Sequence, residues 1–88
     1  MSETEERTIS RWVSDRVLPP GTEPVAVDTP LLTEVGLDSV HLVELVAFLE
    51  AEYGVEVPDG HLTPENFRDV RSIVGMMGRL RTEPTQRS

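Results

Sequence analysis

The segment that decides the fold is Val35-Gly36-Leu37-Asp38-Ser39-Val40, together with the residues directly after it: residues 37–58 read LDSVHLVELVAFLEAEYGVEVP. Gly36 ends one segment, Leu37 supplies an apolar anchor, and Asp38-Ser39 opens a long apolar-rich stretch. We predict a helix over residues 39–53, capped by a glycine in the left-handed conformation. At ~1.5 Å per residue this helix is about 22 Å long. It places the Ser39 hydroxyl at a helix N-terminus, where backbone N–H groups and the helix dipole favour an attached phosphate.

Two further helices are indicated by apolar residues at helical spacing. The first is expected over about residues 6–17, with Ile9, Trp12, Val13 and Val17 on one stripe, and Pro19-Pro20-Gly21 ends it. The last begins after Asp69 as N-cap, and its stripe is Val70, Ile73, Val74, Met77 and Leu80.

Shorter elements are expected in the connections. Thr63-Pro64-Glu65-Asn66-Phe67 has an N-cap, a proline at the first helical position and an acid in the first turn, so it predicts a short helix. The connection over 18–38 is long and contains Pro24 and Pro30, with a short helical turn expected around residues 29–34. Leu31, Leu32, Val35 and Leu37 are the natural residues to pin it to the core.

The predicted fold is therefore all-α: a small four-helix bundle of three main helices and one short helix, with a long loop between the first and second helices. The 88 residues allow one small domain. We expect a flexible N-terminal tail over residues 1–5, the folded domain over 6–81, and a flexible C-terminal tail over 82–88. The core is expected to be aliphatic, because aromatic residues make up only 5% of the chain.

The amino-acid composition limits the classes of function that this chain can have. Residues 17–67 contain ten carboxylates and no Lys or Arg. This argues against nucleic-acid binding and for salt-sensitive docking onto basic protein surfaces, although an acidic surface can also serve solubility alone. There is no cysteine, and the two histidines lack ligand partners at helical spacing, so no metal site is expected. The apolar runs are too short to span a membrane and the N-terminus is unlike a signal peptide, so we expect a cytoplasmic monomer without membrane contact.

The stretch from Leu37 to Pro58 resembles the central segment of acyl carrier proteins and peptidyl carrier proteins of the discrete type: Asp-Ser-Val, then Val-Glu-Leu-Val, then Leu-Glu-Ala-Glu-Tyr. The resemblance extends more loosely over about residues 9–80. It implies that Ser39 carries a 4′-phosphopantetheine arm. It also implies that Asp38 helps to position the transferase and Mg²⁺, which is needed only during loading. Asp38 is equally suited to cap the helix.

The second helix is apolar on more than one side, so part of it is expected to face partners. We assign Leu42, Leu45, Val46, Phe48 and Leu49 to the core. Val40, Val43 and Ala47 are expected to form an exposed apolar ridge next to Ser39, framed by Glu44 and, farther along, Glu50 and Glu52. We predict a partner interface made of Leu37, Val40, Val43, Glu44 and Ala47. The alternative is that Val40 and Val43 are peripheral core residues.

The sequence contains no constellation of catalytic residues, so we expect no enzymatic activity. The resemblance implies a non-catalytic carrier that holds acyl, aminoacyl or peptidyl groups as thioesters on the arm. The implied partners are a phosphopantetheinyl transferase and acyltransferase, ketosynthase, adenylating or condensation enzymes with basic docking surfaces. A specialised polyketide or nonribosomal peptide pathway is favoured over housekeeping fatty-acid synthesis. The alternatives are a fatty-acid carrier and an unmodified helical adaptor that binds one partner through the ridge.

Overall fold

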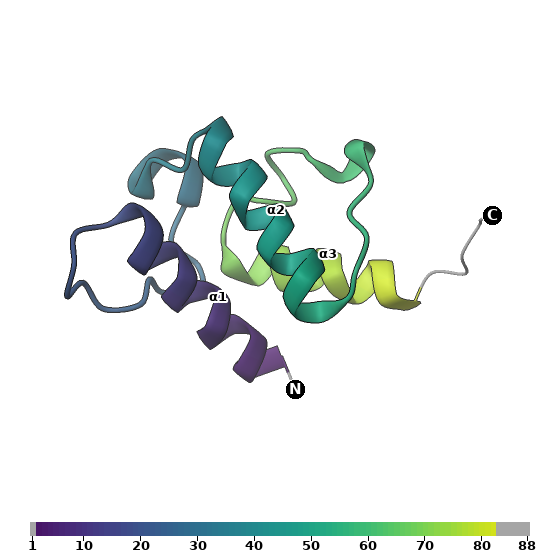
Figure 1. Cartoon of the computed structure of the whole chain (residues 1–88), viewed down its shortest axis with the longest axis horizontal. Coiled ribbons are helices and arrows are strands. Elements are labelled where there is room, and N and C mark those ends of the chain that lie inside the picture. The colour runs from purple at the N-terminus through teal and green to yellow at the C-terminus, as the bar shows by residue number, and fades with distance from the viewer. Residues whose placement is uncertain (1, 83–88) are drawn as a thin grey trace.

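The computed structural model describes residues 2–82 and contains three main helices (Figure 1). These are α1 (Ser2–Val17), α2 (Ser39–Tyr53) and α3 (Val70–Thr82). Two short helical turns, η1 (Leu31–Val35) and η2 (Asp59–His61), lie in the connections, and the described residues contain no strand. Helix α1 contacts both α2 and α3. The predicted all-α bundle with a long connection between its first two main helices is confirmed.

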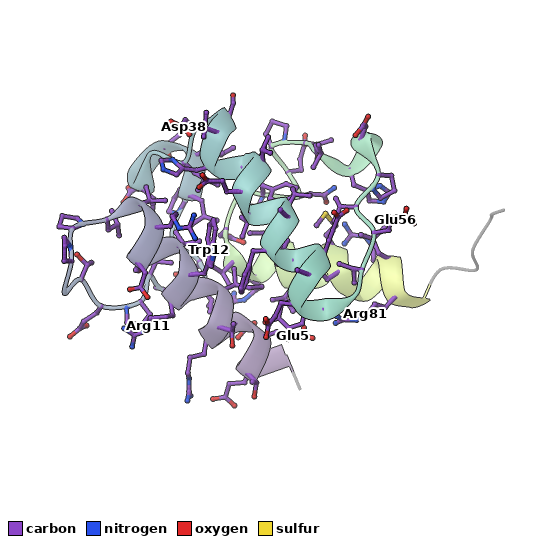
Figure 2. All side chains as sticks on the ribbon, viewed as in Figure 1. Glu5, Arg11, Trp12, Asp38, Glu56 and Arg81 are labelled. Carbon is purple, nitrogen blue, oxygen red and sulfur yellow. The ribbon has the colours of Figure 1, made fainter. Side chains whose placement is uncertain are left out.

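Helix α1 begins at Ser2, four residues before its predicted start. Glu3 and Glu5 lie in its first turn, where carboxylates interact favourably with the helix dipole. The carboxylate of Glu5 also lies 3.0 Å from the guanidinium of Arg81 in α3 (Figure 2). Residues 2–5, expected as part of a tail, are thus helical. Residues 83–88, which make up most of the expected C-terminal tail, lie outside the described residues.

The long connection between α1 and α2 is held to the helices by hydrogen bonds. The Ser14 hydroxyl donates to the Glu23 carbonyl at 2.9 Å. The Arg71 N–H donates to the Val27 carbonyl at 3.0 Å, and the Leu31 N–H donates to the Arg68 carbonyl at 2.8 Å. The predicted helical turn is present as η1, after Pro30 rather than around it. These three hydrogen bonds hold the long connection in one path, although it contains no strand and no long helix.

Helix α2 has the predicted limits and both predicted caps. The Asp38 carboxylate accepts a hydrogen bond from the His41 N–H at 2.9 Å. Gly54 follows the last turn at φ +67°, and its N–H donates to the Glu50 carbonyl at 3.0 Å. A left-handed residue at this place is a common helix stop because it satisfies a carbonyl of the last turn.

The short helix predicted over residues 63–67 is not formed, and this prediction was wrong. Its N-cap is present, since the Thr63 hydroxyl accepts from the Asn66 N–H at 3.3 Å, but only one turn comes after it. Phe67 is buried in the core and the Arg68 carbonyl is bonded to Leu31, so the chain leaves the helical path. The short helical element is instead η2, just upstream. Asp69 then caps α3, as predicted, by accepting from the Ser72 N–H at 2.8 Å.

The core is aliphatic, as predicted, with Phe67 as its one fully buried aromatic ring among the described residues. From α2, Leu45 and Leu49 are fully buried, while Leu42, Val46 and Phe48 pack against the core from half-buried positions. Trp12 of α1 stacks on Phe48 with ring centroids 5.4 Å apart and so joins α1 to α2. The buried apolar residues are Ile9, Val13, Leu31, Leu37, Leu45, Leu49, Val55, Val57, Phe67, Val70, Ile73, Met76 and Met77.

Candidate functional site

Ser39 is the first residue of α2, and its side chain is exposed. It is held there by the two residues that precede Asp38. Gly36 turns the chain at φ +84°, a conformation that side chains with a Cβ rarely adopt. Leu37 then enters the core, and its N–H donates to the Leu31 carbonyl at 3.0 Å. The local sequence thus fixes the start of α2 and leaves a serine hydroxyl at the surface.

Leu37 itself was predicted as part of the partner interface, and the structure corrects this assignment. Only 4% of the side chain is exposed, and it belongs to the core cluster. Removal of a large apolar side chain from water stabilises the folded state, so burial of Leu37 is favoured over its exposure. Leu37 therefore affects the site indirectly: it anchors the chain in the core and so fixes the place where α2 begins.

Asp38 lies at the exposed end of α2 (Figure 2), where His41 contacts it twice. Besides the bond from the His41 N–H, the ring Nδ1 lies 2.9 Å from the same carboxylate oxygen and forms an ion pair when the ring is protonated. The backbone N–H of His41 is the main cause that lowers the pKa of Asp38 below its ordinary value of 3.8. Asp38 is therefore ionised at neutral pH. The expectation that His41 lacks a partner at helical spacing was therefore wrong, since Asp38 stands at i, i+3 from it.

The predicted ridge beside Ser39 is exposed. Val40 and Val43 are 65% and 68% exposed, and Ala47, one turn farther along, is exposed as well. The alternative that the two valines are peripheral core is thereby removed. Together with Ser39 they follow i, i+3/i+4 spacing, so one side of α2 carries both the hydroxyl and the apolar residues. The ridge is therefore an exposed apolar strip that starts at Ser39 and runs along α2.

The three acidic residues expected around the ridge differ in their roles. Glu44 is partly exposed, and its carboxylate lies 3.3 Å from Arg16 of α1. Glu50 accepts a hydrogen bond from the Val57 N–H at 3.0 Å, so it fastens the chain beyond α2 to the helix. Glu52 is exposed. Glu44 is thus the carboxylate beside the ridge, and Glu50 has a structural partner.

Two other kinds of site have no counterpart in the described part of the chain. Within residues 2–82, no three His, Cys, Asp or Glu side chains lie together in a way that could hold a metal ion. None of the helices in that range has the length and apolar character needed to cross a membrane.

Relatives of this chain have carrier functions. It is 41% identical over 46 residues to aminoacyl carrier protein 2 of Bradyrhizobium diazoefficiens, a match that covers 52% of each chain. Aminoacyl carrier protein 1 of the same organism is 39% identical over 46 residues, 52% of this chain and 51% of the relative. The matched segment thus spans about half the length of these two relatives. The acyl carrier protein of Zymomonas mobilis is 41% identical over 61 residues, 67% of this chain and 73% of the relative.

The fold has a solved counterpart. It matches a chain in the crystal structure of Bradyrhizobium japonicum glycine:[carrier protein] ligase complexed with its cognate carrier protein and an analogue of glycyl adenylate. The TM-score is 0.62 at 26% identity, and the match covers 88% of this chain and 90% of that one. The family described as a phosphopantetheine attachment site matches residues 16–77, more than half of the chain. The chain therefore belongs to the phosphopantetheine-binding carrier proteins, whose cofactor is a covalently attached 4′-phosphopantetheine.

Proposed function

We propose that Ser39 is the attachment residue and that this chain carries thioester-bound intermediates between enzymes without catalysing a reaction itself. The observation that carries the proposal is the exposure of Ser39 at the start of α2. Ser10 and Ser14 are buried and Ser72 is half-buried, so Ser39 is the exposed serine among those whose side chains are described. A transferase needs a hydroxyl that it can reach, and the dipole of a 15-residue helix favours the phosphate that results.

Loading requires a phosphoryl transfer to this hydroxyl. The Ser39 oxygen would form a bond to the phosphorus that bears the pantetheine, and the pyrophosphate bond of CoA would break. Adenosine 3′,5′-bisphosphate would leave, and the hydroxyl proton would pass to a base of the transferase. Asp38 is suited to assist, because its carboxylate is ionised and its side chain is 63% exposed. The attached arm supplies a thiol that holds an acyl group as a thioester.

For the cargo, we propose an aminoacyl group that an ATP-dependent adenylating ligase transfers to the thiol, as part of a specialised biosynthetic pathway. Two relatives are named aminoacyl carrier proteins, and the matching solved structure is a complex with a glycine:[carrier protein] ligase. The acyl carrier protein of Zymomonas mobilis, which this chain matches over a longer stretch, supports a second candidate: an acyl cargo from an acyltransferase or ketosynthase.

The attachment is tested by intact-protein mass after incubation with CoA, Mg²⁺ and a broad-specificity phosphopantetheinyl transferase. We expect a gain of one phosphopantetheine in the wild type and in the control Ser72→Ala, and none in Ser39→Ala. Because Ser39 is exposed, its replacement should change the free energy of unfolding by about 0.5 kcal/mol or less. No gain in the wild type, with a transferase that loads a control carrier, would favour the unmodified adaptor instead.

The cargo is tested on the loaded protein. The holo-carrier is incubated with ATP, Mg²⁺, glycine and the glycine:[carrier protein] ligase, or with malonyl-CoA and a malonyl transferase. A mass gain of one glycyl group supports the aminoacyl assignment, with apo-protein as the control. A malonyl gain without a glycyl gain would favour the acyl candidate.

A further inference from the structure

Glu44, the acidic residue beside the apolar ridge, is already paired within this protein. Arg16 in the last turn of α1 donates from Nη1 to its Oε1 at 3.3 Å. The guanidinium also lies 4.9 Å from the centre of the Trp12 ring, a distance typical of a cation–π contact. Because Trp12 stacks on Phe48 of α2, Arg16 is held at the boundary between the two helices. Two independent contacts thus place one positive charge next to the ridge.

The positive charge of Arg16 lies next to a helix whose charged residues are glutamates. Helix α2 contains three glutamates and no Lys or Arg, and the chain has no Lys or Arg from 17 to 67. Arg16 brings a positive charge from α1 to this helix through its ion pair with Glu44. It is 28 residues from Glu44 in sequence, so folding alone brings it there.

We propose that Arg16 is a specificity-determining residue of this docking face, because it competes with a partner enzyme's basic side chain for Glu44. This inference rests on the proposed function, in which enzymes with basic docking surfaces approach α2. The Arg16 and Glu44 side chains are 51% and 41% exposed, so a partner can reach the pair. An incoming Lys or Arg can pair with Glu44 only after it displaces Arg16 from the Glu44 carboxylate. Arg16 therefore weakens docking of strongly basic partners and disfavours them relative to partners that present an acid there.

The test compares Arg16→Gln, Glu44→Gln and the double variant as apo-substrates of a broad-specificity phosphopantetheinyl transferase with a basic docking surface. The matched control is Arg11→Gln, which removes the same charge from an exposed residue of α1 that points away from Trp12 (Figure 2). From the range measured for exposed ion pairs, Arg16→Gln should lower KM about 1.5- to 5-fold at low salt relative to Arg11→Gln, with kcat unchanged. Glu44→Gln should raise KM. In the double variant, Arg16→Gln should not lower KM relative to Glu44→Gln alone.

A second readout reports on Arg16 directly. Trp12 is the only tryptophan, so 5-fluorotryptophan reports on its surroundings through one ¹⁹F signal. Addition of unlabelled transferase to the labelled apo-carrier should shift this signal towards its position in free Arg16→Gln.

Three results would overturn the proposal that Arg16 competes for Glu44. They are equal KM values for Arg16→Gln and Arg11→Gln, a higher KM for Arg16→Gln, and a KM that Arg16→Gln still lowers in the absence of Glu44. None of them would change the assignment of Ser39 as the attachment residue. An unshifted ¹⁹F signal at saturation would likewise overturn the proposal and leave that assignment. If the wild type is not loaded at all, the proposed function fails, and this inference fails with it.

Discussion

Replacement of Leu37 by Ala tests whether this residue belongs to the core or to the partner surface. Its side chain is 4% exposed and packs in the core directly before the start of α2. Removal of its branched end loses about 0.8 kcal/mol per buried CH₂ group, and the cavity left behind adds to this loss. We expect a decrease of about 2–3 kcal/mol in the free energy of unfolding, near the lower end of measured Leu→Ala effects because the loop before Leu37 can partly close the gap. For a domain of this size that corresponds to at least about 8 °C in Tm.

The assay is urea unfolding followed by circular dichroism, with Leu32→Ala as the matched control. Leu32 lies five residues earlier in the same connection, but 36% of its side chain is exposed, so the same chemical change should cost about 1 kcal/mol or less. Below its Tm, Leu37→Ala should be loaded by the transferase with the wild-type KM, because the side chain does not reach the surface. Equal destabilisation by the two variants, or a raised KM in folded Leu37→Ala, would refute the burial argument.

Three further predictions concern α2 and its ends. Glu44→Lys should weaken docking to a basic partner more at low salt than at high salt, because salt screens exposed charges; equal affinities at both concentrations would remove Glu44 from the interface. The Asp38 cap should stabilise the fold fully above about pH 5 and lose this effect as the pH falls through the lowered pKa of the folded state. Protonation removes the negative charge of the carboxylate that accepts the His41 N–H. Asp38→Asn cannot titrate, so its difference from the wild type in acid unfolding should shrink below pH 3.8 and stay constant above about pH 5. Gly54→Ala should lower the free energy of unfolding by about 1–2 kcal/mol, as measured by thermal melting, because φ is +67° there; an unchanged Tm would contradict this.

Much of the site was predictable because its signals are local. The Asp38 cap, the left-handed Gly54 and the exposed ridge depend on side chains within a few residues of one another and on the 3.6-residue helical period. The same holds for the Asp69 cap of α3. The failure at residues 63–67 shows the limit of such signals. A correct N-cap at Thr63 was overridden when Phe67 entered the core and the Arg68 carbonyl bonded to Leu31, a residue far away in sequence.

By itself, the sequence determined the helical periods, the caps and the placement of Ser39 at a helix start, since each of these arises from interactions along the chain. Only the tertiary structure decided which side of each apolar segment is buried, and this turned Leu37 from a surface residue into a core anchor. It also decided the partners of the charged residues. Arg16 meets Glu44, and Arg81 meets Glu5, because helix packing brings these distant segments together. Charge pairs of this kind leave no periodic trace in the sequence, because their spacing depends on how the helices pack against one another.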